Sequence, residues 1–341
     1  MKRTTQLNAI TRFNALKTAI NAVESQPFAF AGVGQGGVME LNASLLTQSS
    51  FQEALTAFAM GWRDDGGQLQ RELDFFAPGV QTARRFEYAE AVNIEQFYSE
   101  TTDDLRGIGA DFKKVEYNST KTTGKTDNRG LMVVVDLDEV KDTPGWEQQK
   151  VAMLMSRIKR NQLRRAIALL AAAATNTAKT WDTTAGKDPD MDVISDLVTA
   201  ATAIGVKANR VGYGDTAWSK RALSHRAQST AGGFASASLT EDALAGILGV
   251  DQVLRSTSRY ASSATAKSEI LSNLVLMFVA MQSADPMDSS NIKCFWTPTD
   301  QGNRYAVHSI PHGIKQHIIA VEHYELLKIT STLGIRKFTV S

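Results

Sequence analysis

Hydrophobic residues recur at helical spacing through several long stretches of the chain. The longest stretch is "WEQQKVAMLMSRIKRNQLRRAIALLAAAATNTAKT", residues 146–180, which contains neither proline nor glycine. Its apolar face includes Val151, Leu154 and Ile158, and continues with Leu163 and Ile167. At ~1.5 Å per residue such a helix spans about 50 Å, whereas the average globular helix has about 11–12 residues. A helix this long requires tertiary packing along its apolar face.

Two further helices are predicted before it. Apolar residues from Leu7 to Val23 recur at spacings of three and four. A second helix is predicted to begin near Ser49–Ser50, where Ser50 and Glu53 fit a capping box, and to end at "DDGG".

Residues 86–140 have the composition of β-strands. β-formers lie on both sides of a polar, threonine-rich stretch, Asn118 to Arg129, which predicts a hairpin with a long solvated tip. Loops longer than about 12 residues in compact domains are usually functional or mobile. A polar β-arm with little to bury in its own subunit indicates a part stabilised by a neighbour.

After Trp181 the pattern alternates between helices and strands. Helices are predicted over 191–206, over 215–228 with Asp215 as cap, and over 239–250 with Thr240 as cap. Strands are predicted at 209–214, 251–257 and 269–281, and the tail over 293–340 is rich in β-formers. The chain therefore has the pattern of an α+β protein.

Composition narrows the functional classes. The 37 basic and 36 acidic residues give a net charge of +1, which argues against a protein dedicated to wrapping nucleic acid. The single cysteine, Cys294, excludes a disulfide within the chain. The N-terminus lacks the apolar region of a secretory signal, and the longest apolar run, Leu274–Met281, is too short to span a bilayer. We expect a soluble protein that stays in the cytoplasm where it is made.

Candidate chemistry is weak. Gly32, Gly34 and Gly37 fit G-x-G-x-x-G, but no helix start follows, so we expect a flexible arm or turn and keep a nucleotide-dependent enzyme as a distant alternative.

Four histidines within a short segment follow no ligand spacing and are expected on strand surfaces rather than around a metal; they are His308, His312, His317 and His323. No base is evident for Cys294, which is expected to be buried and inert. We therefore predict no catalytic residue, metal or cofactor, and no enzymatic activity.

A run of basic residues on the long helix is the main charge feature. Its members are Arg157, Lys159, Arg160, Arg164 and Arg165. They are expected either to form a solvated face or to pair with acidic groups of a neighbouring subunit, or, least favoured, to contact nucleic-acid phosphates.

The order of arm, β-hairpin, long helix and α/β lobe resembles the HK97-type major capsid protein of tailed phages. The passage from "YNSTKTTGKTDNRGLMVVVDLDEV" into the long helix looks like the hairpin and spine helix of the branch labelled major capsid protein E. "ANRVGYGDTAWSKRALSHRAQ", "LTEDALAGILGVDQVLRST", "CFWTPTDQGNRYAVHSIPHG" and "VEHYELLKITSTLGI" resemble later segments of that branch, in the same order. The resemblance covers the chain from about Phe86 onward.

The resemblance implies a domain plan. Residues 1–48 would form an N-terminal arm, and 49–190 with 317–341 a peripheral domain. That domain would contain an extended loop over about 97–133 and the spine helix over 146–178. Residues 191–316 would form the axial domain. Inter-subunit contacts are expected from loop residues Lys121, Lys125 and Arg129 and from helix residues Arg157, Arg160, Arg164 and Arg165.

The implied function is that of a structural shell subunit. Pentamers and hexamers of the chain would build an icosahedral capsid that encloses phage dsDNA, contacted non-specifically. Implied partners are other copies of the chain, a separate scaffolding protein, a portal protein and a possible decoration protein, with no membrane. Assembly would take place in the host cytoplasm, and the protein would end in the virion. The alternative within the same fold is an encapsulin-like cellular nanocompartment. Lysine–asparagine cross-links, known in some relatives, are not predicted.

Overall fold

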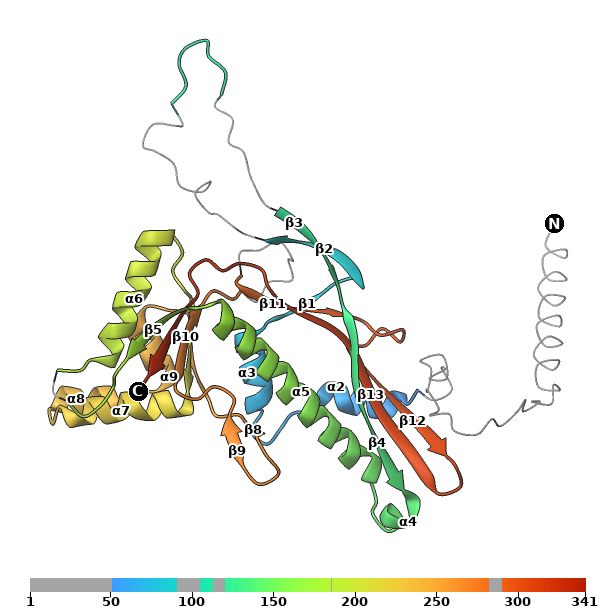
Figure 1. Cartoon of the computed structure of the whole chain (residues 1–341). Helices are drawn as coiled ribbons and strands as arrows, with labels where there is room; N and C mark the ends of the chain where they lie inside the picture. The colour runs from blue at the N-terminus through green and yellow to red at the C-terminus, as the bar shows by residue number, and fades with distance from the viewer. Residues whose placement is uncertain (1–50, 91–104, 113–119, 185, 282–289) are drawn as a thin grey trace, which may run out of the picture. The chain divides into compact units, whose positions relative to one another are not determined.

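The computed structural model describes residues 51–90, 105–112, 120–184, 186–281 and 290–341 (Figure 1). All of them belong to the second of the two units into which the chain divides, Leu46–Ser341. The predicted helix over 7–23, the Gly32–Gly37 loop and the arm over 1–48 lie outside the described residues. The helices of the described part are α2 (Glu53–Gly61), α3 (Gln68–Phe76), α4 (Leu137–Val140), α5 (Trp146–Ala173), α6 (Pro189–Ile204), α7 (Asp215–Ala227), α8 (Ala231–Ala237) and α9 (Glu241–Leu248).

The first sheet is built around one long strand. Its members are β1 (Gly79–Gln81), β4 (Asp127–Asp136), β11 (Ile292–Thr297), β12 (Tyr305–His312) and β13 (Gln316–Ile329). One edge of β13 pairs with β12 and then with β11, both antiparallel, and the other edge pairs with β4, also antiparallel. β1 adds to β11 in parallel. Strands separated by about half of the chain therefore share this sheet.

Helix α5 packs along one face of this sheet, as Figure 1 shows. Val151, Leu154 and Ile158 of α5 are buried against Val307 of β12 and Ile319 of β13. These apolar positions recur at helical spacing, so one side of α5 meets the sheet and the opposite side remains in solvent. The predicted long helix is thus confirmed over 28 residues, a length of about 42 Å at ~1.5 Å per residue.

The end of the long helix was predicted too late. α5 ends at Ala173 instead of near residue 178, and Thr175–Lys179 forms strand β5. β5 pairs in parallel with β14 (Arg336–Val340), whose backbone groups give these residues a strand partner.

The second sheet has the order β5-β14-β10-β6-β7. Its remaining strands are β6 (Arg210–Gly214), β7 (Gln252–Ser256) and β10 (Leu274–Phe278), close to the predicted strands. Helices α6 and α9 pack on it through Val193, Leu197, Leu244 and Leu248, in a core that includes Tyr213. The predicted helix over 191–206 is confirmed as α6, which begins and ends two residues earlier. The Thr240 cap is also confirmed, because its side chain accepts a hydrogen bond from the Ala243 backbone N–H.

A shared core joins α3, α5 and both sheets. Phe76 of α3, Leu163 and Leu170 of α5, and Phe278 of β10 belong to it. Gly212 makes the approach of α3 possible, since a Cβ there would lie 2.7 Å from the Phe76 ring. The sequence pattern did not predict α3.

Two small antiparallel pairs complete the described structure. β2 (Arg85–Glu90) pairs with β3 (Thr120–Lys125), and β8 (Arg259–Ala261) pairs with β9 (Lys267–Glu269). Phe86 and Tyr88 of β2 pack on Phe295 of β11, with Phe86 and Phe295 ring centroids 4.6 Å apart. The β2–β3 pair is therefore attached at its base to the first sheet.

The predicted position of the hairpin tip was wrong. Residues 120–125 are β3, and residues 127–129 begin β4. The connection between the paired strands is instead residues 91–119. The threonine-rich stretch has strand partners, because Lys121 lies opposite Ala89 and Arg129 lies opposite His323.

Two predicted caps were also wrong. α2 begins at Glu53 after Gln52, which makes no side-chain cap, rather than near Ser50. Asp215 is the first residue of α7 and not its cap. Its carboxylate instead forms ion pairs with two arginines, with Arg255 Nη2 at 2.5 Å and Arg259 Nη2 at 2.9 Å.

A domain boundary was predicted at residue 316, but each of the two sheets contains strands from both sides of that residue. β11 and β12 lie before that residue but share a sheet with β13 and β4, whereas β14 lies after it and belongs to the sheet of β6 and β10.

Candidate functional site

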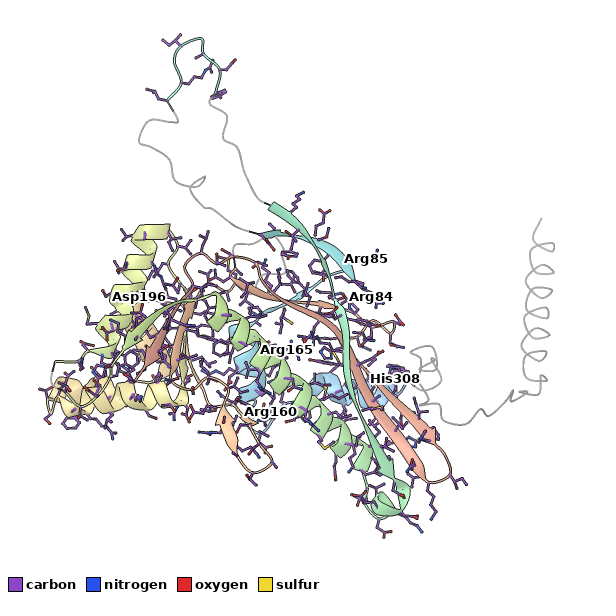
Figure 2. The ribbon with its side chains drawn as sticks, in the orientation of Figure 1. Arg84, Arg85, Arg160, Arg165, Asp196 and His308 are labelled. Carbon is purple, nitrogen blue, oxygen red and sulfur yellow. The ribbon has the colours of Figure 1, made fainter. Side chains whose placement is uncertain are left out.

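The basic side chains predicted to contact other subunits lie on three elements. Lys121 and Lys125 are exposed on β3. Arg129 is exposed on β4 and lies 3.5 Å from the Glu325 carboxylate. The other four lie on α5, where Figure 2 shows Arg160 and Arg165. The structure therefore does not gather the seven predicted residues into one site.

The α5 arginines have different surroundings. Arg165 forms an ion pair with Glu325 of β13. Arg160 donates from Nε to Ser156 Oγ at 3.2 Å and from Nη1 to the Arg259 carbonyl oxygen at 3.0 Å. The Arg164 guanidinium lies 3.9 Å from the centroid of the Tyr260 ring. Arg160 and Arg164 thereby hold the β8–β9 hairpin against α5.

Of the two remaining cations of this run, Arg157 is exposed and Lys159 is buried. Its Nζ donates to the Trp62 carbonyl oxygen at 2.9 Å and lies over the Trp62 ring. Burial and, secondarily, the nearby Arg304 lower the pKa of Lys159 to about 8. This lysine therefore links α5 to the end of α2 and is not part of the solvent-facing surface.

Glu325 is the centre of a buried charge cluster on β13. Its carboxylate is 1% exposed and contacts Arg165 and Arg129, with His323 Nε2 at 3.5 Å. Burial alone would raise the pKa of Glu325, but His323 and Arg165 favour the carboxylate more strongly, so its pKa is lowered. The cluster joins α5, β4 and β13.

The histidines are more buried than expected from the sequence. His308 and His323 are buried, which corrects the expectation of four surface histidines. His308 Nε2 lies 3.2 Å from Glu322 Oε1, and His317 Nε2 lies 2.6 Å from Ser309 Oγ. In the part of the chain that the structure describes, no group of three or more His, Cys, Asp and Glu side chains has the arrangement of a metal site.

A second buried ion pair lies between α6 and α7. The Arg221 guanidinium donates to both carboxylate oxygens of Asp190, at 2.6 and 2.7 Å, and also to the Ser236 carbonyl oxygen. His225 Nε2 lies 3.2 Å from the same carboxylate. Burial opposes ionisation of Asp190, but the hydrogen bonds of His225 and Arg221 outweigh it and lower the pKa. No sequence pattern indicated this pair, whose members are 31 positions apart.

Cys294 is buried, as predicted. Its Sγ accepts a hydrogen bond from Gln162 Nε2 of α5 at 3.0 Å. Burial raises the pKa of the thiol to about 11, so very little thiolate exists at neutral pH.

We expect stability to fall on acidification. The pKa values of Asp190, Glu322 and Glu325 are lowered from ordinary values of 3.8, 4.5 and 4.5. A lowered carboxyl pKa stabilises the fold above the unfolded-state pKa, and this contribution is lost as the pH falls through the folded-state value. The contribution of these carboxylates to the urea midpoint should therefore be retained down to about pH 5 and be lost below about pH 4.5. Glu325→Gln should reduce this acid-induced decrease, and an equally steep decrease in that variant would contradict the role of Glu325.

The described part of the connection between β2 and β3 exposes large apolar side chains. Leu105, Ile108 and Phe112 are 73%, 110% and 80% exposed. Arg106 lies over the Phe112 ring at 4.8 Å. Apolar side chains grouped on one exposed segment are typical of a surface that contacts a partner.

A shallow groove lies between α5 and the β8–β9 hairpin. Its volume is about 650 Å³, and Asn161, Arg164 and Tyr260 are among its lining residues. Among the described residues, none of the helices is both long enough and apolar enough to cross a bilayer.

Comparison with known proteins identifies the fold. No protein-family model and no curated protein matches the sequence. The crystal structure of a phage-related protein from Bordetella bronchiseptica RB50 matches with a TM-score of 0.62 at 17% identity, over 84% of this chain and 96% of that chain. The capsid structure of Cyanophage P-SCSP1u matches with a TM-score of 0.51 at 10% identity, over 93% and 94% of the two chains. The predicted HK97-like capsid fold is thus confirmed, whereas assignment to the major capsid protein E branch remains a prediction.

Proposed function

We propose that this chain is the major capsid protein of a tailed bacteriophage. Copies of it would form the pentamers and hexamers of an icosahedral shell that encloses dsDNA. In this role the protein is a structural part of the virion, assembled in the host cytoplasm, and carries no enzymatic activity.

The observation that carries this proposal is the fold likeness to a phage capsid. The match to the cyanophage capsid extends over 93% of this chain and 94% of that chain. A partial match could reflect one common motif, but this one follows nearly the whole subunit.

The exposed apolar segment supports assembly independently. Leu105, Ile108 and Phe112 remain largely exposed within their own subunit. Fully burying a side chain of this kind stabilises a complex by roughly 1.5–3 kcal/mol. A neighbouring copy that covered all three would gain a substantial part of the energy of a specific contact. We therefore assign the segment to an inter-subunit loop.

The two sheets suggest how the domains are divided. We assign α5 and the sheet of β1, β4, β11, β12 and β13 to the peripheral domain. The sheet of β5, β6, β7, β10 and β14 with α6–α9 then forms the axial domain. This plan moves β11 and β12 into the peripheral domain and β14 into the axial domain, relative to the boundaries expected from sequence.

Other partners follow from the proposed role. A capsid of this kind is completed by a scaffolding protein, a portal protein and packaged dsDNA, and a decoration protein is a further candidate. Lys121 and Lys125 on β3 are proposed to contact a neighbouring copy, because both are exposed on the pair that leads into the inter-subunit loop.

Particle formation is the direct test. The purified full-length protein, alone and coexpressed with the neighbouring genes of its source, should sediment as large particles and appear as closed shells in negative-stain images. A monodisperse monomer or dimer under all of these conditions would contradict the proposal. An enzyme cargo in place of DNA in the purified shells would indicate a nanocompartment instead.

A further inference from the structure

The solvent-facing side of α5 carries a row of cations. After Glu147, no acidic residue occurs through the end of α5 at Ala173. The residues that recur on the outer side at helical spacing, which we call the basic stripe, are Lys150, Arg157, Arg160 and Arg164. Arg157 and Arg164 are exposed, and the other two are partly exposed. At ~1.5 Å per residue the basic stripe extends for about 21 Å.

The described residues do not neutralise the charges of the basic stripe by ion pairing. The other two cations of the helix, Lys159 and Arg165, are directed to the Trp62 carbonyl oxygen and to Glu325. By contrast, among the described residues no carboxylate forms an ion pair with any member of the basic stripe. Because the whole chain has a net charge of only +1, this is a local concentration of positive charge.

Two members of the basic stripe are already held in place. Arg160 is fixed by Ser156 and the Arg259 carbonyl oxygen, and Arg164 lies on the Tyr260 ring. A guanidinium has five N–H donors, so each retains donors for an anionic ligand. Side chains ordered before binding lose less conformational entropy when they bind.

The basic stripe lacks the features of a protein–protein interface core. Such cores are apolar and depleted in charge. Of the large hydrophobic side chains of α5, only that of Met153 is clearly exposed, at 42%. A line of cations suits a regular polyanion better, and each strand of duplex DNA carries one phosphate per ~3.4 Å of helix axis.

We propose that the basic stripe binds the phosphates of duplex DNA, so that α5 is the DNA-facing surface of the shell subunit. This inference rests on the proposed capsid function, and it adds which residues meet the packaged nucleic acid. The contacts involve phosphates alone and are independent of base sequence. A site of this size gives weak, strongly salt-dependent binding, with Kd on the order of 10⁻⁴–10⁻⁶ M.

The test compares two double variants of the unassembled full-length protein. Lys150→Gln/Arg157→Gln removes two members of the basic stripe. Lys141→Gln/Arg226→Gln removes the same charge from exposed positions after α4 and on α7. The side chains of Lys150, Arg157, Lys141 and Arg226 form no hydrogen bond or ion pair with the described residues, so all substitutions should preserve folding. Binding to a fluorescent DNA duplex is measured by anisotropy over a range of salt concentrations.

The stripe variant should lose affinity by about 50-fold near 0.1 M salt, with a decrease of about two in the slope of log K against log salt. The control variant should bind within about twofold of the unsubstituted protein. Equal losses in the two variants, or an unsubstituted protein that does not bind DNA, would overturn the inference. Tighter binding to poly-glutamate than to DNA of the same charge would overturn it in favour of an acidic protein partner.

Particle formation separates this inference from the proposed function. If the stripe variant assembles normally but retains less nuclease-protected DNA, both proposals are supported. If it assembles and protects DNA at the normal level, only the assignment of the basic stripe fails. If the unsubstituted protein forms no shells, the capsid function fails whatever the anisotropy shows.

Discussion

Replacing residues 91–119 with an Asn-Gly turn should abolish particle formation while leaving the subunit folded. Glu90 and Thr120 are direct partners at the end of the β2–β3 pair, so a tight turn can close the shortened hairpin. The base of the pair remains held by Phe86 and Tyr88 on Phe295. The replacement removes the largely exposed apolar side chains of residues 105–112. Sedimentation and negative-stain images measure assembly, and circular dichroism measures folding.

A substitution variant makes this test finer. Leu105→Ser/Ile108→Ser/Phe112→Ser should reduce particle yield nearly as much as the replacement, whereas Gly107→Ser/Ala110→Ser, in the same segment, should not. Normal particle yield from both the replacement and the triple variant would show that this segment is not needed between subunits.

Asp190→Ala should destabilise the subunit far more than the loss of an exposed ion pair. The change leaves the fully buried Arg221 guanidinium without its carboxylate. Removing one partner of a buried ion pair costs about 3–5 kcal/mol, because the remaining charge is buried and uncompensated. Asp138→Ala is the matched control, since its pair with Lys315 is 64% exposed on both sides and is worth about 0.2–1 kcal/mol. Urea unfolding followed by tryptophan fluorescence measures both.

A double variant checks the physical cause. Asp190→Leu/Arg221→Met replaces both charged groups with apolar side chains and should recover most of the lost stability. Similar losses for Asp190→Ala and Asp138→Ala would mean that the buried pair contributes no more than an exposed one.

The helices were largely predictable because their signals are local. α5 has an uninterrupted apolar face and lacks glycine and proline up to Ala173, and α9 begins after a threonine that caps it. The end of α5 was not predictable in the same way. "TNTAK" contains no helix breaker, and it becomes β5 because residues 336–340 provide a parallel partner.

The β2–β3 pair shows the limit of reading strands from composition. "TKTTGK" lacks alternating apolar residues, which favours a solvated tip, yet it pairs with residues 85–90 on the far side of a long connection. In the same way, the burial of His308 and His323 depends on the register of β12 and β13 and on neighbouring elements. The identity of the side chains alone specifies neither the pairing of β3 nor the burial of these histidines.

The sequence identified the candidate contact residues, but it did not show which of them are exposed and which are paired within the subunit. Arg157 and Arg165 are equivalent members of one basic run, but the helical period turns Arg165 toward Glu325 and leaves Arg157 in solvent. Lys159 is turned inward between them. The exposed apolar segment over 105–112 was not predicted, because "LRGIGADF" has no periodicity that distinguishes a docking segment from an ordinary loop.

The position of β14 has a consequence for synthesis. This strand, residues 336–340, lies between β5 and β10 in the second sheet, so β5 has its partner only after residue 340 has been made. A ribosome-bound or truncated chain would keep β10 and β5 apart, each with an open edge that invites wrong pairing.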